Sequence, residues 1–219
     1  MYMASDLVGH LKNSFVLADR LESKIDGGIL SLEGMSGTKT RHFLNNLCSL
    51  PGTRYLEIGS WKGSTVCAAM CKNNATVTCV DNWSEFGGPR LMFYANFNRY
   101  IGNNVANVIE QDAFTINLSK MGKFNVYMYD GAHDDISHYK ALTYFINNMD
   151  NKFVYVVDDW NWKGVRDATR RAIADLKLDI LWEKEIRLTD DDTHTKDAAL
   201  GKSTYHNGIF ACVLGKTGQ

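Results

Sequence analysis

The apolar positions of the chain switch between helical spacing and short continuous runs. From Ser5 to Ile25 they recur every three or four residues, which predicts an amphipathic helix that covers the core. A second helix is expected over 38–49, before Pro51 and Gly52. Further along, we expect strands at 54–58, 76–80, 106–110, 124–129, 153–157, 179–187 and 207–214, and helices at 64–72, 89–100, 134–148 and 164–177.

This alternation predicts an α/β fold with a doubly wound, mostly parallel seven-stranded sheet and an antiparallel edge strand. The length of 219 residues suits one domain. We assign residues 1–50 to N-terminal helices that cover this domain and residues 51–219 to its core. The polar segment 188–206 is too long for a tight turn, so we expect a mobile surface loop or a lid there.

The segment 55–65 reads as a buried strand, a turn that contains Gly59 and Gly63, and a helix start. Glycines let a ligand approach the backbone, and the N–H groups of the following helix can face that ligand. The next strand ends at Asp81, about 20 residues past the first glycine, where a carboxylate can accept both hydroxyls of a ribose. The pattern therefore predicts a nucleotide-binding corner.

A carboxylate stands at or just after the end of each central strand. Five strand ends are acidic in this way, one of them with two neighbouring acids. So many carboxylates on one edge of a sheet would crowd negative charge unless a cation or ligand compensates it. Asp130, Asp158 and Asp159 offer hard oxygen donors, which suit magnesium, manganese or calcium better than zinc. The alternative is that these three acids cap the helices that follow them. The whole set is Glu57, Asp81, Asp112, Asp130 and Asp158-Asp159.

His133 follows Asp130 by three residues at the mouth of the same cleft. An imidazole whose pKa lies near 6.5 can take a proton there, which predicts a catalytic base. A second metal ligand and an exposed helix cap remain alternatives. His138, His194 and His206 have no such neighbours in the sequence, and we expect ordinary surface residues.

With these motifs, about 30–214 of the chain resembles the class I S-adenosylmethionine-dependent methyltransferases, which have a Rossmann-like fold. More narrowly, it resembles the cation-dependent O-methyltransferases of the catechol and macrocin types. Segment 57–63 looks like the first motif of the family, Asp81 like its ribose-binding acid, and 111–113 like the element that contacts adenine. The resemblance implies S-adenosylmethionine as cofactor. The cofactor-binding residues that we infer are Glu57, Gly59, Ser60, Trp61, Gly63, Ser64, Asp81, Asn82, Trp83, Asp112, Ala113 and Asp130.

The same resemblance matches Asp130, Asp158 and Asp159 to the metal-binding acids of these enzymes, and His133 to their lysine or histidine base. It implies Mg2+, or another hard divalent cation, as a second cofactor. Asp158-Asp159 departs from relatives that carry an acid followed by asparagine, which leaves oxygen ligands in place. By similarity, segment 33–36 is expected to close over the methionine end of the cofactor.

The reaction expected from this resemblance is O-methylation of a small hydroxylated acceptor. Trp160, Trp162 and the segment 83–94 place aromatic side chains near the cleft, which favours a planar or sugar-like acceptor, although core packing would explain them equally well. Three alternatives stay open: a metal-dependent hydroxylase on the same fold, a dinucleotide-dependent oxidoreductase, and a non-catalytic nucleotide-binding protein. The spacing of Gly59 and Gly63 differs from the G-x-G-x-x-G of the oxidoreductases.

Composition narrows the classes of partner. With 24 basic and 25 acidic residues, the chain has no charge that favours nucleic acid or a membrane surface. No apolar run is long enough to span a bilayer and the start lacks the pattern of a signal peptide, so we expect a cytoplasmic protein. The five cysteines lack a CxxC pair and are expected to be buried, reduced thiols. Homodimerisation through the N-terminal helices is expected by analogy.

Overall fold

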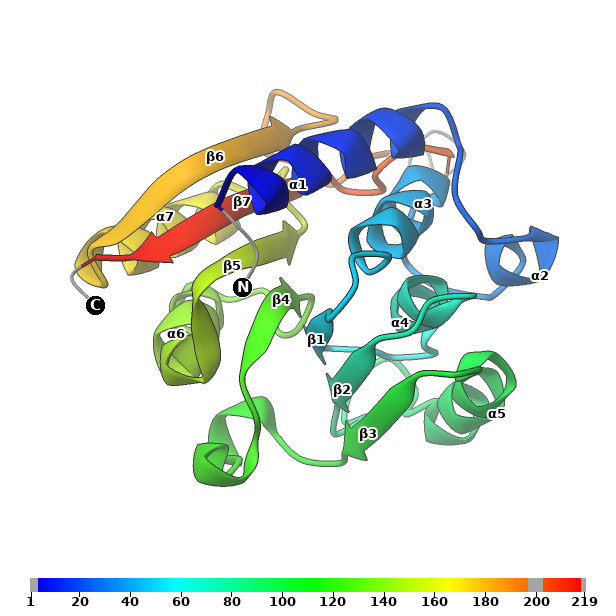
Figure 1. Ribbon diagram of the computed structural model, residues 1–219. Helices are drawn as coiled ribbons and strands as arrows, with labels where there is room; N and C mark the ends of the chain where they lie inside the picture. The colour runs from blue at the N-terminus through cyan, green and yellow to red at the C-terminus, as the bar shows by residue number, and fades with distance from the viewer. Residues whose placement is uncertain (1–3, 197–202, 218–219) are drawn as a thin grey trace.

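The computed structural model describes residues 4–196 and 203–217 (Figure 1). Its centre is a seven-stranded sheet with the order β3-β2-β1-β4-β5-β7-β6. The first five strands of this order are parallel, and β7 is antiparallel to both of its neighbours. The strands are β1 (Arg54–Ile58), β2 (Thr76–Val80), β3 (Val105–Ile109), β4 (Phe124–Tyr129), β5 (Met149–Asp158), β6 (Leu178–Ile186) and β7 (Ile209–Lys216).

This topology confirms the predicted mostly parallel, doubly wound sheet and its antiparallel strand. The antiparallel strand is β7, which lies one position inside the edge strand β6. Burial explains this order, because β7 is buried over nearly its whole length whereas β6 is exposed at most positions. A strand that is apolar on both faces gains more from an interior position than a strand with polar, exposed positions.

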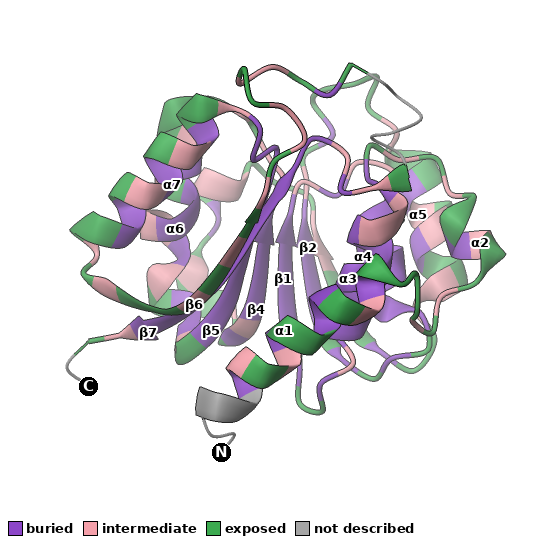
Figure 2. Ribbon diagram, turned by 90° about the horizontal axis from the view of Figure 1, so that it is seen from above, coloured by how far each residue is buried: buried purple, intermediate pink, exposed green. Residues whose placement is uncertain are grey.

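Helices cover both faces of the sheet (Figure 2). Neighbouring residues of β4 show how the two cores are divided. Val126 and Met128 belong to the core that packs against α1, α3, α4 and α5, whereas Tyr127 and Tyr129 belong to the core with α6 and α7. The helices are α1 (Ala4–Asp19), α2 (Gly27–Leu30), α3 (Thr38–Leu47), α4 (Ser64–Met70), α5 (Arg90–Tyr100), α6 (Asp135–Phe145) and α7 (Lys163–Asp175).

The first helix is shorter than its apolar pattern predicts. We expected it to continue to Ile25, but α1 ends at Asp19. The N–H of Glu22 donates to the carbonyl of Leu17, and the N–H of Leu21 donates to the carbonyl of Ala18. These bonds form a Schellman motif, in which Leu21 takes the left-handed position (φ 57°) that glycine usually occupies. The sequence has no glycine there, so it contained no signal for this helix end.

Other expectations concern the thiols, the membrane and the loop before β7. All five cysteines are buried and none forms a disulfide, as predicted. Among the described helices, none has both the length and the apolar character needed to cross a membrane. Segment 188–206 is described on both sides of residues 197–202, and those six positions of the expected loop or lid lie outside the described residues.

Leu21→Gly is expected to stabilise the fold by about 1 kcal/mol, because the left-handed conformation costs a leucine roughly that much and glycine almost nothing. The Leu21 side chain is 49% exposed, so little packing is lost. Urea unfolding of both proteins measures the difference. Glu22→Gly, one residue further along, is the control and should destabilise, so a loss of stability in Leu21→Gly as well would contradict this account.

Candidate functional site

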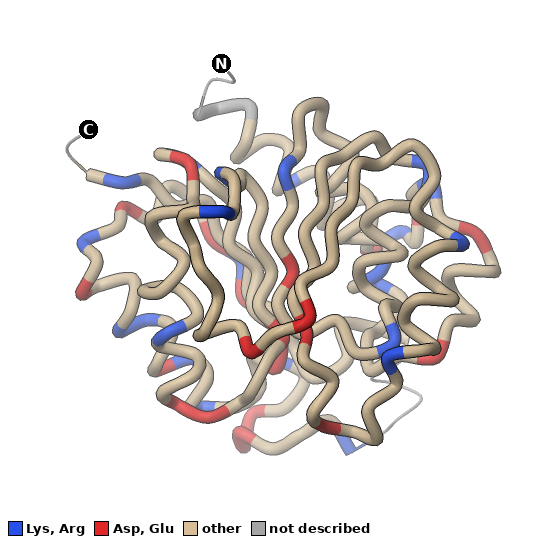
Figure 3. Tube along the Cα trace, turned by 90° about the horizontal axis from the view of Figure 1, so that it is seen from below, with Lys and Arg blue, Asp and Glu red and all other residues tan. Residues whose placement is uncertain are grey.

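The carboxyl ends of the central strands open into one cavity of about 420 Å³. Figure 3 shows several acidic positions close together near the middle of the molecule. All the site residues inferred from sequence line this cavity except Glu57 and Gly63. The cavity size lies in the range of small-molecule sites. The lining residues from the sequence prediction are Gly59, Ser60, Trp61, Ser64, Asp81, Asn82, Trp83, Asp112, Ala113, Asp130, His133, Asp158 and Asp159.

Gly59 joins the turn after β1 to the end of β4. Its φ is 84°, and a Cβ atom at this position would lie 1.9 Å from the carbonyl oxygen of Asp130. No side chain fits such a gap. The missing side chain therefore lets the two strand ends approach each other, and it leaves the backbone of the turn open to a ligand.

Asp81 pins the glycine turn from the neighbouring strand. Its Oδ2 accepts the backbone N–H groups of Ser60 and Trp61, both at 2.8 Å, and its Oδ1 accepts that of Trp83 at 2.7 Å. Each carboxylate oxygen can accept more than one hydrogen bond. Three of about four lone-pair sites of Asp81 are used in this way, so one site at Oδ1 remains for a ligand hydroxyl in the cavity, such as one of a ribose.

Glu57 shapes the turn from behind and does not face the cavity. It is fully buried and accepts hydrogen bonds from the hydroxyls of Tyr55 (2.6 Å), Ser60 (2.9 Å) and Thr65 (3.0 Å). Burial raises the pKa of Glu57 to about 7, although these three hydrogen bonds act in the opposite direction. Glu57 therefore stabilises the glycine turn through buried hydrogen bonds.

On the β3 side of the cavity, Asp112 begins a short 3-10 turn over Ala113–Thr115. Its Oδ1 accepts the backbone N–H of Phe114 at 2.8 Å. Asp112, Ala113 and Phe114 form one wall, with Asn82 and Trp83 from the end of β2. This wall combines an aromatic ring with polar backbone groups, which suits a flat, hydrogen-bonding base such as adenine.

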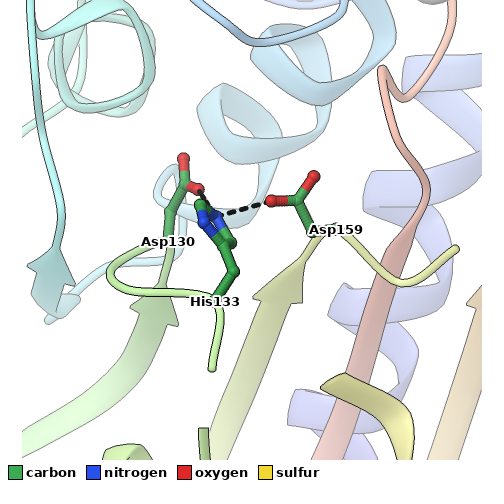
Figure 4. Close-up of side chains that lie close together, drawn as sticks. All are labelled: Asp130, His133 and Asp159. Atoms are coloured by element: carbon green, nitrogen blue, oxygen red, sulfur yellow. Dashed lines mark ion pairs between the residues drawn. The ribbon is translucent and has the colours of Figure 1, made fainter. Parts of the chain in front are cut away.

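Asp130, His133 and Asp159 form a cluster on the other side of the cavity (Figure 4). The Nε2 atom of His133 lies 2.5 Å from Oδ2 of Asp159 and 3.9 Å from Oδ1 of Asp130. One ligand atom from each of the three residues lies within 4.8 Å of the others. Asp130 follows β4 and Asp159 follows β5, and these strands are neighbours as the sequence analysis required.

Electrostatics in this cluster favour a positive charge. Burial alone would lower the pKa of His133, but its contacts with Asp130 and Asp159 outweigh that effect and raise the pKa to about 10. The two carboxylates therefore favour the protonated, positively charged form of His133. The pKa of Asp159 is lowered in spite of its burial, chiefly because of His133.

Asp158 lies beside this cluster but outside it. The side chain is buried, and its Oδ1 atom has no hydrogen-bond partner among the described residues. Burial, with the charges of Asp130 and Asp159, raises its pKa well above the usual range. The structure thus places His133 together with Asp130 and Asp159. The third acid of the predicted metal site, Asp158, has an oxygen without a hydrogen-bond partner among the described residues.

Two histidines that line the cavity were not predicted as site residues, whereas Trp162, beside them, was expected near the cleft. Trp162, His194 and His206 line the cavity, with ring centroids 6.0 Å apart for Trp162–His194 and 5.4 Å for His194–His206. We expected both histidines, and also His138, to be ordinary surface residues. His194 is indeed exposed, although it lines the cavity, and His206 is half-buried. The expectation was wrong for His138 of α6, which is buried against Tyr129, because a lone histidine carries no signal of the fold around it.

The link between α2 and α3 (residues 31–37) also reaches the cavity. Two of its residues, Met35 and Ser36, line it. Ser36 Oγ lies 2.9 Å from Ser64 Oγ, so the link contacts the start of α4 directly. Arg41 of α3 holds the link in place, because its guanidinium donates to the carbonyls of Ile29 and Leu32 and to the hydroxyl of Ser36. The segment 33–36 thus lies where it can contact a bound cofactor.

Glu57→Gln should lose less stability than the wild type when the pH rises from 5 to 8. A folded-state pKa of about 7, above the ordinary 4.5, means that the folded protein keeps a proton that the unfolded chain releases. The free energy of unfolding of the wild type therefore falls between pH 4.5 and 7 by roughly 3 kcal/mol on account of this group. Urea unfolding at pH 5 and pH 8 should show the variant without this loss.

Glu85→Gln is the control, since Glu85 is exposed. The result that counts is the change in the stability difference between the variant and the wild type from pH 5 to pH 8. A difference that stays constant over this range would mean that Glu57 is ionised throughout.

Residues 56–160 match a family model described as a methyltransferase domain. No curated protein matched the chain. Among solved structures, the O-methyltransferase from Bacillus cereus in complex with SAH (S-adenosylhomocysteine) is 15% identical, with a TM-score of 0.55 over 97% of this chain and 92% of that one. Cofactor-bound Rv0187 from MTB is 16% identical, with a TM-score of 0.57 over 96% and 91%. A putative O-methyltransferase from Klebsiella pneumoniae is 11% identical, with a TM-score of 0.57 over 94% and 89%.

At these identities, the likeness to the solved structures shows the fold, and the family match covers the segment from β1 to the end of β5. That segment contains the glycine turn, Asp81 and the cluster of Asp130, His133 and Asp159. Residues 56–160 therefore match a methyltransferase domain, and the chain as a whole has the fold of the solved methyltransferases.

Proposed function

We propose that the enzyme methylates a hydroxyl oxygen of a small acceptor, with a hard divalent cation bound beside the cofactor. The observation that carries this proposal is the cluster of Asp130, His133 and Asp159, which shares one cavity with the glycine turn. Two carboxylates and an imidazole close to a methyl donor can hold and deprotonate a hydroxyl group. The names of the similar proteins from Bacillus cereus and Klebsiella pneumoniae, both O-methyltransferases, support oxygen as the acceptor atom.

The donor set fits a hard cation. Asp130, His133 and Asp159 present three ligand atoms, and the unpartnered Oδ1 of the buried Asp158 lacks the compensation that a cation would give it. We assign the cation to the three acids predicted from the sequence, Asp130, Asp158 and Asp159, with His133 beside it and not bound to it. When bound, the cation would supply Lewis-acid polarisation of the acceptor oxygen.

His133 is the residue that we assign to proton removal. It can accept a proton at Nε2 only when the imidazole is neutral, whereas the two carboxylates by themselves favour the imidazolium. A cation between the carboxylates would repel that positive charge and lower the pKa of His133 toward neutrality. The cluster would thus exchange one positive charge for another and free the imidazole to act as a base.

Positioning is the other contribution of the chain. S-adenosylmethionine, when bound, supplies an electrophilic methyl group. The turn at Gly59 lies against the backbone of Asp130, so a ligand on the turn is close to the acid cluster. Trp162, His194 and His206 form an aromatic wall near the cluster, which suits a flat or sugar-like acceptor. Close and fixed placement of oxygen and methyl lowers the entropic part of the barrier.

The same cluster favours one alternative. Two carboxylates and one imidazole also bind ferrous iron, which would suit a hydroxylase. A calorimetric titration of the metal-stripped protein with S-adenosylhomocysteine, repeated with magnesium and with NAD, separates these functions. Micromolar binding of S-adenosylhomocysteine followed by magnesium-dependent methylation of hydroxylated compounds supports the proposal. Oxygen-dependent turnover with iron would support the hydroxylase instead.

His133→Ala should reduce the methylation rate by roughly 10²- to 10⁴-fold, the usual contribution of a general base. The affinity for S-adenosylhomocysteine should be unchanged, because the imidazole lies on the acid side of the cavity and away from Asp81. Rates at saturating acceptor and calorimetric titrations measure both quantities. His10→Ala on α1 is the matched control, and unchanged turnover in His133→Ala would remove the histidine from the mechanism.

Asp159→Asn should weaken Mn2+ binding by at least roughly tenfold, because it removes a charged ligand from the cluster. Chelation of the cation should lower the rate of the wild type by about 10²-fold or more. Electron paramagnetic resonance of free Mn2+ gives the affinity, and Asp179→Asn on the exposed strand β6 controls for the loss of one charge. Full activity in the presence of EDTA would rule out a role for the cation.

A further inference from the structure

Asn207, just before β7, contacts Asp159 of the acid cluster, although it lies 48 residues further along the chain. Its side chain is completely buried, and its Nδ2 donates to Oδ1 of Asp159 at 2.7 Å. We infer that Asn207 is the positioning residue of the cation site, since it holds Asp159 so that one oxygen faces the cluster. This inference rests on the cation binding proposed above.

The two oxygens of Asp159 have different partners. Oδ1 accepts from Asn207, whereas Oδ2 lies 2.5 Å from His133 and belongs to the cluster. A carboxylate that is free to turn about its last torsion could offer either oxygen or both. The hydrogen bond from Asn207 removes that freedom, so Asp159 is set in advance as a ligand with a single oxygen.

The backbone at Asp159 needs this support. Asp159 directly follows β5 and has a φ of 55°, a left-handed conformation that costs a residue with a side chain about 1–2 kcal/mol. Two backbone bonds hold the corner, one from the N–H of Trp162 to the carbonyl of Asp159 and one from the N–H of Asn161 to the carbonyl of Asn207. Asn207 therefore fixes both the backbone and the side chain at this point.

The amide of Asn207 is itself fixed from its other side. Its Oδ1 accepts from the side chain of Asn161 at 2.9 Å and from the backbone N–H of Thr195 at 3.1 Å. Asn161 is also fully buried, and its Oδ1 accepts the N–H of Leu188 at 2.8 Å. This network ties Asp159 to the segments that carry His194 and His206, the two histidines of the aromatic wall.

Only an amide satisfies all these partners. Asn207 must donate to a carboxylate and accept from two N–H groups at the same time. An ionised carboxylate in its place could not donate and would repel Asp159, and an apolar side chain would take this partner away from Asp159 Oδ1 and from the N–H of Thr195. The chemistry thus explains why an asparagine stands here, and why its loss should act on the cation site.

The test compares Mn2+ affinity in the full-length wild type and Asn207→Ala, measured by electron paramagnetic resonance, with S-adenosylhomocysteine affinity measured by calorimetry. We expect Mn2+ binding to weaken roughly 10- to 100-fold, the usual effect of removing a partner of a metal ligand. Binding of S-adenosylhomocysteine should not change. Asn207→Ser is the second variant if the alanine protein does not fold.

Asn148→Ala is the matched control, because Asn148 is another buried asparagine that donates to three carbonyls far from the cluster. It should lose stability and keep its Mn2+ affinity. Equal Mn2+ affinity in wild type and Asn207→Ala would overturn the role of Asn207 and leave the cation proposal standing. Parallel losses of Mn2+ and S-adenosylhomocysteine binding would reduce Asn207 to a structural residue. A wild type that binds no Mn2+ would overturn both ideas.

Discussion

The register of four parallel strands is the constraint on which the rest of the site depends. Ile58 of β1 is paired with Val80 of β2 and with Tyr129 of β4, and Tyr129 is paired with Val157 of β5. The next residue of each strand therefore falls in one row across the edge of the sheet. That row is Gly59, Asp81, Asp130 and Asp158, and it contains three carboxylates. Crowded carboxylates repel one another, so this edge of the sheet attracts positive charge.

The contact between Gly59 and Asp130 makes the cofactor turn and the acid cluster one unit. The carbonyl of Asp130 fills the space that a side chain at position 59 would need. The N–H of Asp130 donates to the carbonyl of Ile58 at 2.9 Å, which fixes the same corner from below. Movement of the turn would therefore move a cluster residue. In the proposed function, this coupling would keep a methyl donor bound at the turn close to a hydroxyl held at the cluster.

Local patterns were enough to predict most of this arrangement. Buried runs located the strands to within a few residues, and the glycine turn and the acid at position 81 belong to one strand-turn-helix-strand unit. The end of α1 at Leu21 and the position of β7 inside β6 could not be predicted, because they depend on an unusual backbone conformation and on relative burial. His133 was predicted from its offset from Asp130, but its contact with Asp159, and that of Asn207 with Asp159, depend on distances between side chains that come from separate elements. No spacing in a single sequence contains those distances.

Backbone strain indicates where the fold gives up stability for the sake of the site. Nine non-glycine residues of the described chain have a positive φ, and five of these line the cavity. Glycine would adopt the same conformation without strain, so each of the five keeps a side chain at a cost of roughly 1–2 kcal/mol. Packing alone does not justify that cost at Phe86, which is 60% exposed. We infer that these positions keep their side chains because the side chains serve the site. The five residues are Trp61, Trp83, Phe86, Asp159 and His206.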